Sequence, residues 1–359
     1  MSWLLAFVGF SLLIVLHELG HFFAAKAVGM RVERFSLFFP PLIFRKKYGE
    51  TEYAIGSIPL GGYVKISGMS PSEDLPDEVR TRAYTAQPVW KRIVVIAAGP
   101  AVNLVLALLL LFVFFSAIGP RELTDRVGQP QPGSPAAEQL RPGDRLVEVD
   151  GVRGDQQTLR DAIGRHRCAG EQVDGCKAAT PASVRIDRGG RPLQLEITPE
   201  YNAAAERPLL GFTYAAGERV PYPVGEAATI SVERFWFITK ETLKLPARLF
   251  NAEQRKEISG VVGSYEVTRQ TIIEDLASVV GILAIISLSL GLINLFPFLP
   301  LDGGHIFWAL IEKVRRKPVS FSVMERSGVI GFALVMVLFI IGFTNDLDRL
   351  TSGEGFSTR

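Results

Sequence analysis

Four strongly apolar stretches divide the chain of 359 residues. The first begins at Trp3 and runs to Leu16, and uncharged runs follow at Ile93–Ile118, Leu276–Leu301 and Ser327–Asn345. A helix needs about 20 apolar residues to cross the hydrocarbon layer of a bilayer. The pattern therefore predicts a polytopic α-helical membrane protein with about four transmembrane helices, for which the lipid bilayer is an expected partner.

A different pattern lies between the first two apolar runs. From Glu52 to Ile66 the residue types alternate, with glycines at positions 56, 61 and 62. Period-two alternation is typical of strands, and glycine within such a run favours turns and bulges. We expect a membrane-associated β-hairpin at about 52–66.

The second and third apolar runs are separated by about 150 residues, enough for a separate domain. Short alternating runs occur at Arg145–Val149, Ser183–Ile186 and Leu193–Ile197, with one helical stretch near Thr158–His166. They predict a β-rich domain inserted between two membrane parts.

The segment Val224–Phe250 mixes aromatic and aliphatic residues with charges at helical spacing, until Pro246 interrupts it. It predicts an amphipathic helix at the bilayer surface. The expected organisation is an N-terminal membrane part over 1–120, the β-rich domain over 121–216, an amphipathic juxtamembrane region over 217–270, a C-terminal membrane part over 271–345 and a short tail over 346–359.

Composition agrees with a membrane protein. Hydrophobic residues make up 48% of the chain and the mean hydropathy is +0.23, whereas charged residues reach only 21%. Soluble domains average about 25% charged residues. The net charge of +2 and the absence of a basic stripe with interleaved aromatics give no reason to expect nucleic acid as a partner.

Lysine and arginine predict the orientation. The stretch between the first two spans carries Lys26, Arg31, Arg34, Arg45, Lys46, Lys47, Lys91 and Arg92, and the link between the last two carries Lys313, Arg315, Arg316 and Lys317. Positively charged loops stay cytoplasmic. We therefore expect both termini and the β-rich domain outside. Met1 and Ser2 offer no basic region ahead of the first run, so we expect no cleaved signal peptide.

Both cysteines, Cys168 and Cys176, lie in the β-rich domain, within a glycine-containing loop. An oxidising exterior permits a disulfide across so short a loop. A pair of metal-binding thiols is the alternative, although His166 is the one histidine near them in the sequence.

The first apolar run leads into the candidate chemistry, an H-E-L-G-H motif at residues 17–21. On a helix His17 and His21 lie one turn apart on the same face, so both rings can bind one zinc ion. A catalytic zinc site uses three protein ligands and leaves a fourth position for water. Glu18 then serves as the base that takes the proton of this water. The alternative is a chance occurrence of the motif, which its membrane setting disfavours.

A candidate third ligand follows the third run, where Asp302 is the first charged residue after some 26 uncharged ones. Pro297 and Pro300 end the preceding helix, and the glycines at 303 and 304 let backbone approach a metal closely. Alternatively, Asp302 only caps the next helix. His305 competes as a ligand, although we expect it beside the ligands rather than among them.

The order and content of these motifs resemble the site-2 protease family of intramembrane zinc metalloproteases. H17-E-L-G-H21 and N294-L-F-P-F-L-P-L-D-G-G304 match its two signature motifs, while P59-L-G-G-Y-V-K65 and A98-G-P-A-V-N103 are similar to the bacterial regulator-of-sigma-E protease branch. The resemblance implies zinc ligands His17, His21 and Asp302, a catalytic acid and base at Glu18, and contact between Asn294 and the substrate backbone.

Cleavage of a transmembrane helix requires local unwinding, because the helix otherwise keeps its carbonyl groups hydrogen-bonded. We hypothesise that an exposed edge of the hairpin, near Gly61 and Gly62, receives the unwound strand. A purely structural hairpin is the alternative. In the family that the chain resembles, a membrane re-entrant β-loop occupies this place.

Within the β-rich domain, Gly133–Gly151 resembles the core of a bacterial PDZ domain, a fold that binds peptide ends or strands. One such unit is expected. It either binds the extracytoplasmic part of a substrate or blocks access sterically.

The sequence therefore predicts a zinc endopeptidase of the bacterial plasma membrane, with its active site toward the cytoplasm. The resemblance implies single-pass transmembrane substrates, such as anti-sigma factors or signal-peptide remnants. A non-catalytic membrane module that binds peptides through the PDZ-like domain is the alternative. A metal-ion transporter would need several polar groups along a path, whereas here they gather at one site.

Overall fold

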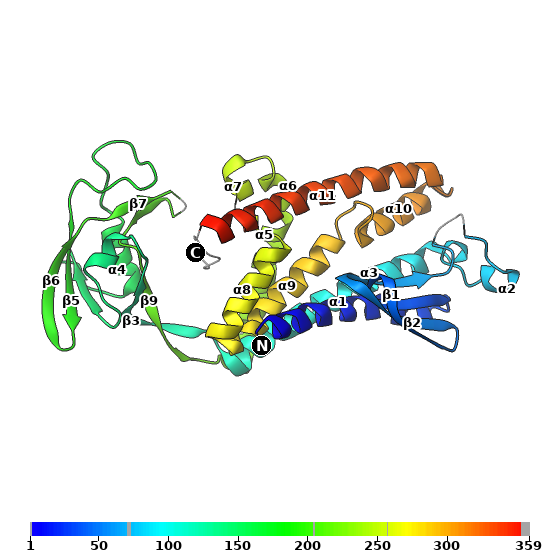
Figure 1. Ribbon diagram of the computed structural model, residues 1–359, viewed down its shortest axis with the longest axis horizontal. Coiled ribbons are helices and arrows are strands. Elements are labelled where there is room, and N and C mark those ends of the chain that lie inside the picture. Colours follow the sequence, from blue (N-terminus) through cyan, green and yellow to red (C-terminus); the bar gives the residue numbers. More distant parts are fainter. Residues whose placement is uncertain (1, 70–72, 204, 257, 353–359) are drawn as a thin grey trace. The chain divides into compact units, whose positions relative to one another are not determined.

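The computed structural model describes residues 2–69, 73–203, 205–256 and 258–352 (Figure 1). The chain forms two compact units. We call Met1–Ile118 together with Pro221–Arg359 the membrane unit, and Gly119–Val220 the inserted unit. The sequence placed the inserted β-rich domain at 121–216.

Within the described residues, four helices of the membrane unit are long and apolar enough to cross a membrane, which confirms the expected polytopic architecture. They are α1 (Ser2–Ala27), α3 (Val89–Val113, continued by the π-helical turn η2, Phe114–Ile118), α9 (Val279–Asn294, preceded by the 3-10 turn η4, Leu276–Ser278) and α11 (Phe321–Ser352). The third span therefore ends at Asn294, before the prolines, rather than at Leu301.

The last helix is longer than expected. Polar residues after Asn345 indicated a tail over 346–359, but α11 continues to Ser352, and residues 353–359 lie outside the described part of the chain. Asp346 is fully buried and accepts hydrogen bonds from the backbone N–H groups of Gly260 and Gly263. Because Asp346 binds the backbone of an earlier segment of the chain, its polar side chain is accommodated within α11.

Helix α3 packs against α1, α9 and α10 (Asp302–Arg315), as Figure 1 shows. Small residues allow close contact: a Cβ at Gly20 would lie 2.6 Å from the carbonyl oxygen of Ala98, and one at Gly291 would lie 3.1 Å from that of Pro100. Ser287 also donates a hydrogen bond of 2.9 Å to the carbonyl of Asn103. Such contacts are typical of membrane helices.

The expected hairpin at 52–66 is corrected by the structure. Residues Thr51–Ile66 form a single strand, β2, which pairs antiparallel with β1, Val32–Tyr48. Its glycines do not make the turn, which lies at Gly49 and Glu50. They allow close backbone contact instead, since a Cβ at Gly56 would overlap with the carbonyl of Phe39.

Strand β1 is bent, with a positive φ at Phe38 and a cis peptide bond between Pro40 and Pro41. Its first half, at Phe35, pairs with both Val64 and Tyr53 of β2. The residues 62–66 of β2 consequently form an edge whose one strand neighbour, among the described residues, is β1.

The sheet is joined to one end of the helices by a hydrophobic core. Its buried members are Phe22, Ala25, Met30, Val32, Ile66, Tyr84, Val95 and Ile96. The short helices α2 (Asp77–Arg80) and η1 (Tyr84–Ala86) precede α3. At the hairpin turn, hydrogen bonds from Arg82 and Lys26 hold the pKa of Glu50 at about 2, well below its ordinary value.

After the inserted unit the chain forms α5 (Val224–Leu243), α6 (Leu245–Arg248), α7 (Ala252–Lys256) and α8 (Val261–Glu274). The helical segment is interrupted just ahead of Pro246, as expected. Helix α8 packs on α1, where the Tyr265 hydroxyl donates a hydrogen bond of 2.7 Å to the carbonyl of Trp3.

The inserted unit contains a five-stranded sheet in the order β6-β5-β4-β3-β9. The strands are β3 (Arg121–Pro130), β4 (Arg145–Val149), β5 (Ala182–Arg188), β6 (Arg191–Ile197) and β9 (Phe212–Arg219), with a small pair β7 (Glu200–Asn202) and β8 (Arg207–Leu209), the turn η3 (Pro135–Glu138) and one helix, α4 (Gln156–Ile163). The expected disulfide joins Cys168 to Cys176.

Candidate metal centre and active site

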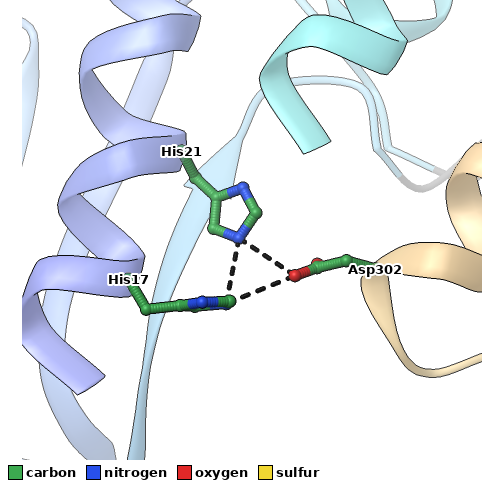
Figure 2. Close-up of side chains that lie close together, drawn as sticks. All are labelled: His17, His21 and Asp302. Carbon is green, nitrogen blue, oxygen red and sulfur yellow. Dashed lines mark hydrogen bonds and ion pairs between the residues drawn. The ribbon is translucent and has the colours of Figure 1, made fainter. Parts of the chain in front are cut away.

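Three side chains from the two ends of the chain meet in the membrane unit (Figure 2). One carboxylate oxygen of Asp302 lies 3.2 Å from Nε2 of His17 and 3.3 Å from Nε2 of His21. The two Nε2 atoms are 3.3 Å apart. Both histidines are buried, with 7% of each exposed. These are the three side chains that the sequence motifs predicted as metal ligands.

The donor set fits zinc. Ligand atoms about 2.0 Å from a tetrahedral ion are separated by about 3.3 Å, which is the spacing of these three atoms. The Asp302 oxygen is buried, and within the described residues it has no partner with hydrogen-bond geometry, despite its two imidazole neighbours. A buried carboxylate oxygen without such a partner is costly, and a cation between the three atoms would satisfy it.

Contacts between α1 and α3 position His21. Its Nδ1 lies 2.9 Å from the carbonyl oxygen of Val95, so this nitrogen carries the proton and Nε2 is free to bind metal. A Cβ at Gly99 would overlap with the imidazole ring, and a Cβ at Gly20 would meet Ala98. The sequence pointed to the glycine-containing 98–103 stretch, but not to Gly99 as the surface on which His21 packs.

The loop after α9 positions Asp302. Backbone at Gly303 and Gly304 packs so closely on Leu295 and Phe298 that a Cβ at either glycine would overlap with it. Leu301 occupies the N-cap position of α10, and Asp302 is the first helical residue. The alternative in which Asp302 serves as the helix cap is therefore wrong. His305 lies outside the group of three side chains that could hold a metal ion, a group sought among the described residues.

A cavity of about 390 Å³ adjoins the three ligands and contains the remaining candidate residues. Glu18, Gly61, Gly62 and Asn294 all line it, as do Tyr63 and Val64 of the β2 edge. The cavity therefore places a carboxylate, an amide side chain and a strand edge beside one potential metal site.

Comparisons with known proteins agree with this site. Residues 5–338 match the profile of peptidase family M50. The chain belongs to peptidase family M50. The site-2 protease resemblance is thereby confirmed. Like its family, the chain is an intramembrane zinc metalloprotease, and its four apolar helices agree with an inner-membrane location.

Individual M50 relatives are similar over nearly their whole length. A protein of Brucella suis named as a zinc metalloprotease is 30% identical over 94% of this chain and 92% of its own. One of Campylobacter jejuni, also named as a zinc metalloprotease, is 29% identical over 95% and 91%. The regulator of sigma-E protease RseP of Salmonella typhimurium is 29% identical over 96% and 97%.

Proposed function

We propose that this M50 peptidase binds zinc through His17, His21 and Asp302 and uses Glu18 as its catalytic acid and base. The convergence of two imidazole nitrogens and a carboxylate oxygen at 3.2–3.3 Å carries the proposal. Zinc, when bound there, polarises the peptide carbonyl and acidifies a water molecule. Glu18 lines the same cavity. It takes a proton from the attacking water and delivers it to the leaving amide nitrogen.

The edge of β2 is the proposed docking place for substrate. An extended peptide that adds to residues 62–66 would lie beside Glu18, because Gly62, Tyr63 and Val64 line the same cavity as that carboxylate. Glycine at position 62 allows β2 to lie close to its neighbours. A Cβ there would lie 3.0 Å from the carbonyl of Ser36 and 3.1 Å from Cγ of Glu18. Strand addition supplies hydrogen bonds to a backbone that has left its helix.

Asn294 is the proposed partner of the substrate backbone on the opposite side. It lines the cavity at the end of α9, where its Nδ2 donates a bond of 3.1 Å to the Leu290 carbonyl. Its carboxamide has a second donor hydrogen and a carbonyl acceptor, which can bind one peptide group.

The proposed substrates are single-pass membrane proteins, cut within or near their transmembrane segment. Residues of the apolar helices α1, α3 and α9 line the cavity, so a membrane-embedded peptide is the proposed substrate class. The Salmonella relative is named for the regulation of sigma-E. Anti-sigma factors and signal-peptide remnants are accordingly the classes to test first.

We also propose that the site faces the cytoplasm and that the inserted unit is extracytoplasmic. The support is the basic stretch between α1 and α3, together with the basic residues at the end of α10. A disulfide in the inserted unit agrees with an oxidising exterior.

The inserted unit is proposed to be a PDZ-like domain. Support comes from its five-stranded sheet, its single helix α4 and the Gly133–Gly151 segment. The edge strands β6 and β9 offer backbone to a peptide strand. It either recruits substrate or excludes large periplasmic domains. Deleting the unit would distinguish these roles, since recruitment predicts slower cleavage of every substrate and exclusion predicts cleavage of bulkier ones.

Cleavage of a transmembrane model substrate by purified protein in lipid nanodiscs tests the function. Glu18→Gln should keep the bound zinc and abolish turnover, whereas Asp302→Ala should lose both. Equal activity of Glu18→Gln and the wild type would remove Glu18 from the mechanism. A zinc-free, inactive wild type that still bound substrate peptide would favour the peptide-binding module.

A further inference from the structure

A further polar contact joins the N-terminal and C-terminal parts of the membrane unit, at the far end of α10. The guanidinium of Arg92, in the first turn of α3, donates hydrogen bonds of 3.0 and 2.6 Å to the two carboxylate oxygens of Glu312. Arg92 is only 9% exposed and lies over the ring of Tyr84, 5.9 Å from its centroid. This bidentate geometry is the strong form of an arginine–carboxylate contact.

The placement of these charges is unfavourable for each helix taken alone. The N-terminal end of a helix carries a partial positive charge and its C-terminal end a partial negative one. Arg92 nevertheless lies near the start of α3, and Glu312 lies in the last turn of α10. Local helix electrostatics therefore cannot explain the two residues, whereas their contact with each other can.

Helix α10 is packed along one face. Gly303, Gly304 and Ala309 are buried, and Ile306 packs against the core that includes Val95 and Ile96. The other face is open, with Phe307, Leu310 and Val314 exposed. The close contacts of Gly303 and Gly304 lie at the start of α10, so the Arg92–Glu312 contact holds the other end of the helix.

We propose that the Arg92–Glu312 pair is a positioning device for the metal centre, which fixes α10 on α3 and thereby holds the Asp302 carboxylate opposite His17 and His21. The inference rests on the proposed metal centre. Asp302 and Glu312 lie about 15 Å apart along one helix, so a tilt of about 4° displaces the carboxylate by about 1 Å. Metal ligands tolerate only about 0.2 Å.

The test is zinc affinity, measured by chelator competition on the full-length protein in nanodiscs. We expect Arg92→Gln and Glu312→Gln each to weaken zinc binding by about 10- to 100-fold, the range for residues that orient metal ligands. The exchange Arg92→Glu with Glu312→Arg restores the pair and suits both helix dipoles. This double variant should recover at least half of the lost zinc affinity on a logarithmic scale.

A matched control lies in the inserted unit, where Arg188 makes the same kind of bidentate contact with buried Asp144, at 2.8 and 2.7 Å. Asp144→Asn should leave zinc affinity unchanged. Hydrogen exchange in the metal-free protein gives a second readout: Glu312→Gln should speed exchange in α10, and Asp144→Asn should not.

Wild-type zinc affinity in both single variants would overturn the inference, as would an exchange variant no better than the singles. If Arg92→Gln fails to fold, Arg92→Lys replaces it. Arg92→Lys keeps the positive charge but cannot form the bidentate contact. Its zinc affinity should lie between those of the wild type and Glu312→Gln. Failure of the proposed function is distinguishable, because His17→Ala would then leave zinc binding intact.

Discussion

The imidazole of His21 packs directly on the backbone of Gly99, at the point where α3 crosses α1. No side chain fits between the ring and the helix. The carbonyl of Val95, one turn earlier on α3, is the hydrogen-bond partner of the same ring. Helix α3, which carries none of the three proposed ligands, therefore determines the orientation of one of them.

Replacement of Gly99 tests this contact. We expect Gly99→Ala to weaken zinc binding by about 10- to 100-fold and to destabilise the protein by about 1–3 kcal/mol, since the added methyl group must displace the His21 ring. Zinc titration and thermal unfolding measure the two effects. Gly281→Ala is the control, because a Cβ there would make ordinary contact at 3.5 Å with the Phe114 ring. Normal zinc affinity in Gly99→Ala would contradict the role given to the crossing.

Replacement of Gly62 tests the edge of β2. We expect Gly62→Val to slow cleavage by about 10- to 100-fold with bound zinc unchanged, because the added side chain would press against the Ser36 carbonyl and Glu18 and displace the β2 edge on which the substrate is proposed to dock. Gly170→Val provides the control, as nothing lies within 4 Å of a Cβ at that position. Zinc loss in Gly62→Val would show a global effect, and unchanged turnover would remove the edge from substrate binding.

The site could be predicted from the sequence to the extent that its chemistry is local. His17, Glu18 and His21 lie within two helical turns, and the position of Asp302 after an uncharged run with prolines was visible as well. The convergence of Asp302 on the histidines depends on the packing of α10 against α3, which no local pattern encodes. Gly99 was part of a noted motif, but its contact with His21 is equally non-local.

The hairpin shows the same limit for the fold. Alternation of residue types predicted β2. Strand β1 contains Pro40, Pro41 and a basic cluster at 45–47, so the sequence indicated its positive charge but not that it is a strand. Both prolines fall at the bend, where the pairing with β2 is interrupted. Proline and charge are tolerated at edges and bends of sheets, which makes them poor guides to whether a strand exists.

The inserted unit should lose stability in acid. Burial opposes ionisation of Asp144, but the hydrogen bonds from Arg188 outweigh it and lower the pKa of this carboxyl. A group whose pKa is lowered by folding stabilises the folded state above its unfolded pKa of about 3.9, and this contribution is lost as the pH falls through the folded value. Asp144→Asn should remove about 2 kcal/mol at pH 7 and less at pH 3. Hydrogen exchange across β4 and β5 measures the loss of stability at each pH. An equal loss at the two pH values would contradict a stabilising role for the ionised Asp144 carboxylate.

Asp346 should contribute to the stability of the membrane unit. It is fully buried and accepts hydrogen bonds from Ser259, Gly260 and Gly263 at the start of α8. Asp346→Ala leaves these donors without a partner, so we expect a loss of about 1–3 kcal/mol in unfolding experiments in detergent. Asp348→Ala changes an exposed carboxylate on the same helix and should have little effect. Equal stability of the two variants would show that the contact is not stabilising.

The metal centre itself is tested most directly by an anomalous difference map, collected at the zinc absorption edge from crystals of catalytically active protein. The account predicts one peak in contact with Nε2 of His17, Nε2 of His21 and a carboxylate oxygen of Asp302, and no such peak in crystals of Asp302→Ala. An active preparation with no zinc between these three side chains would contradict it.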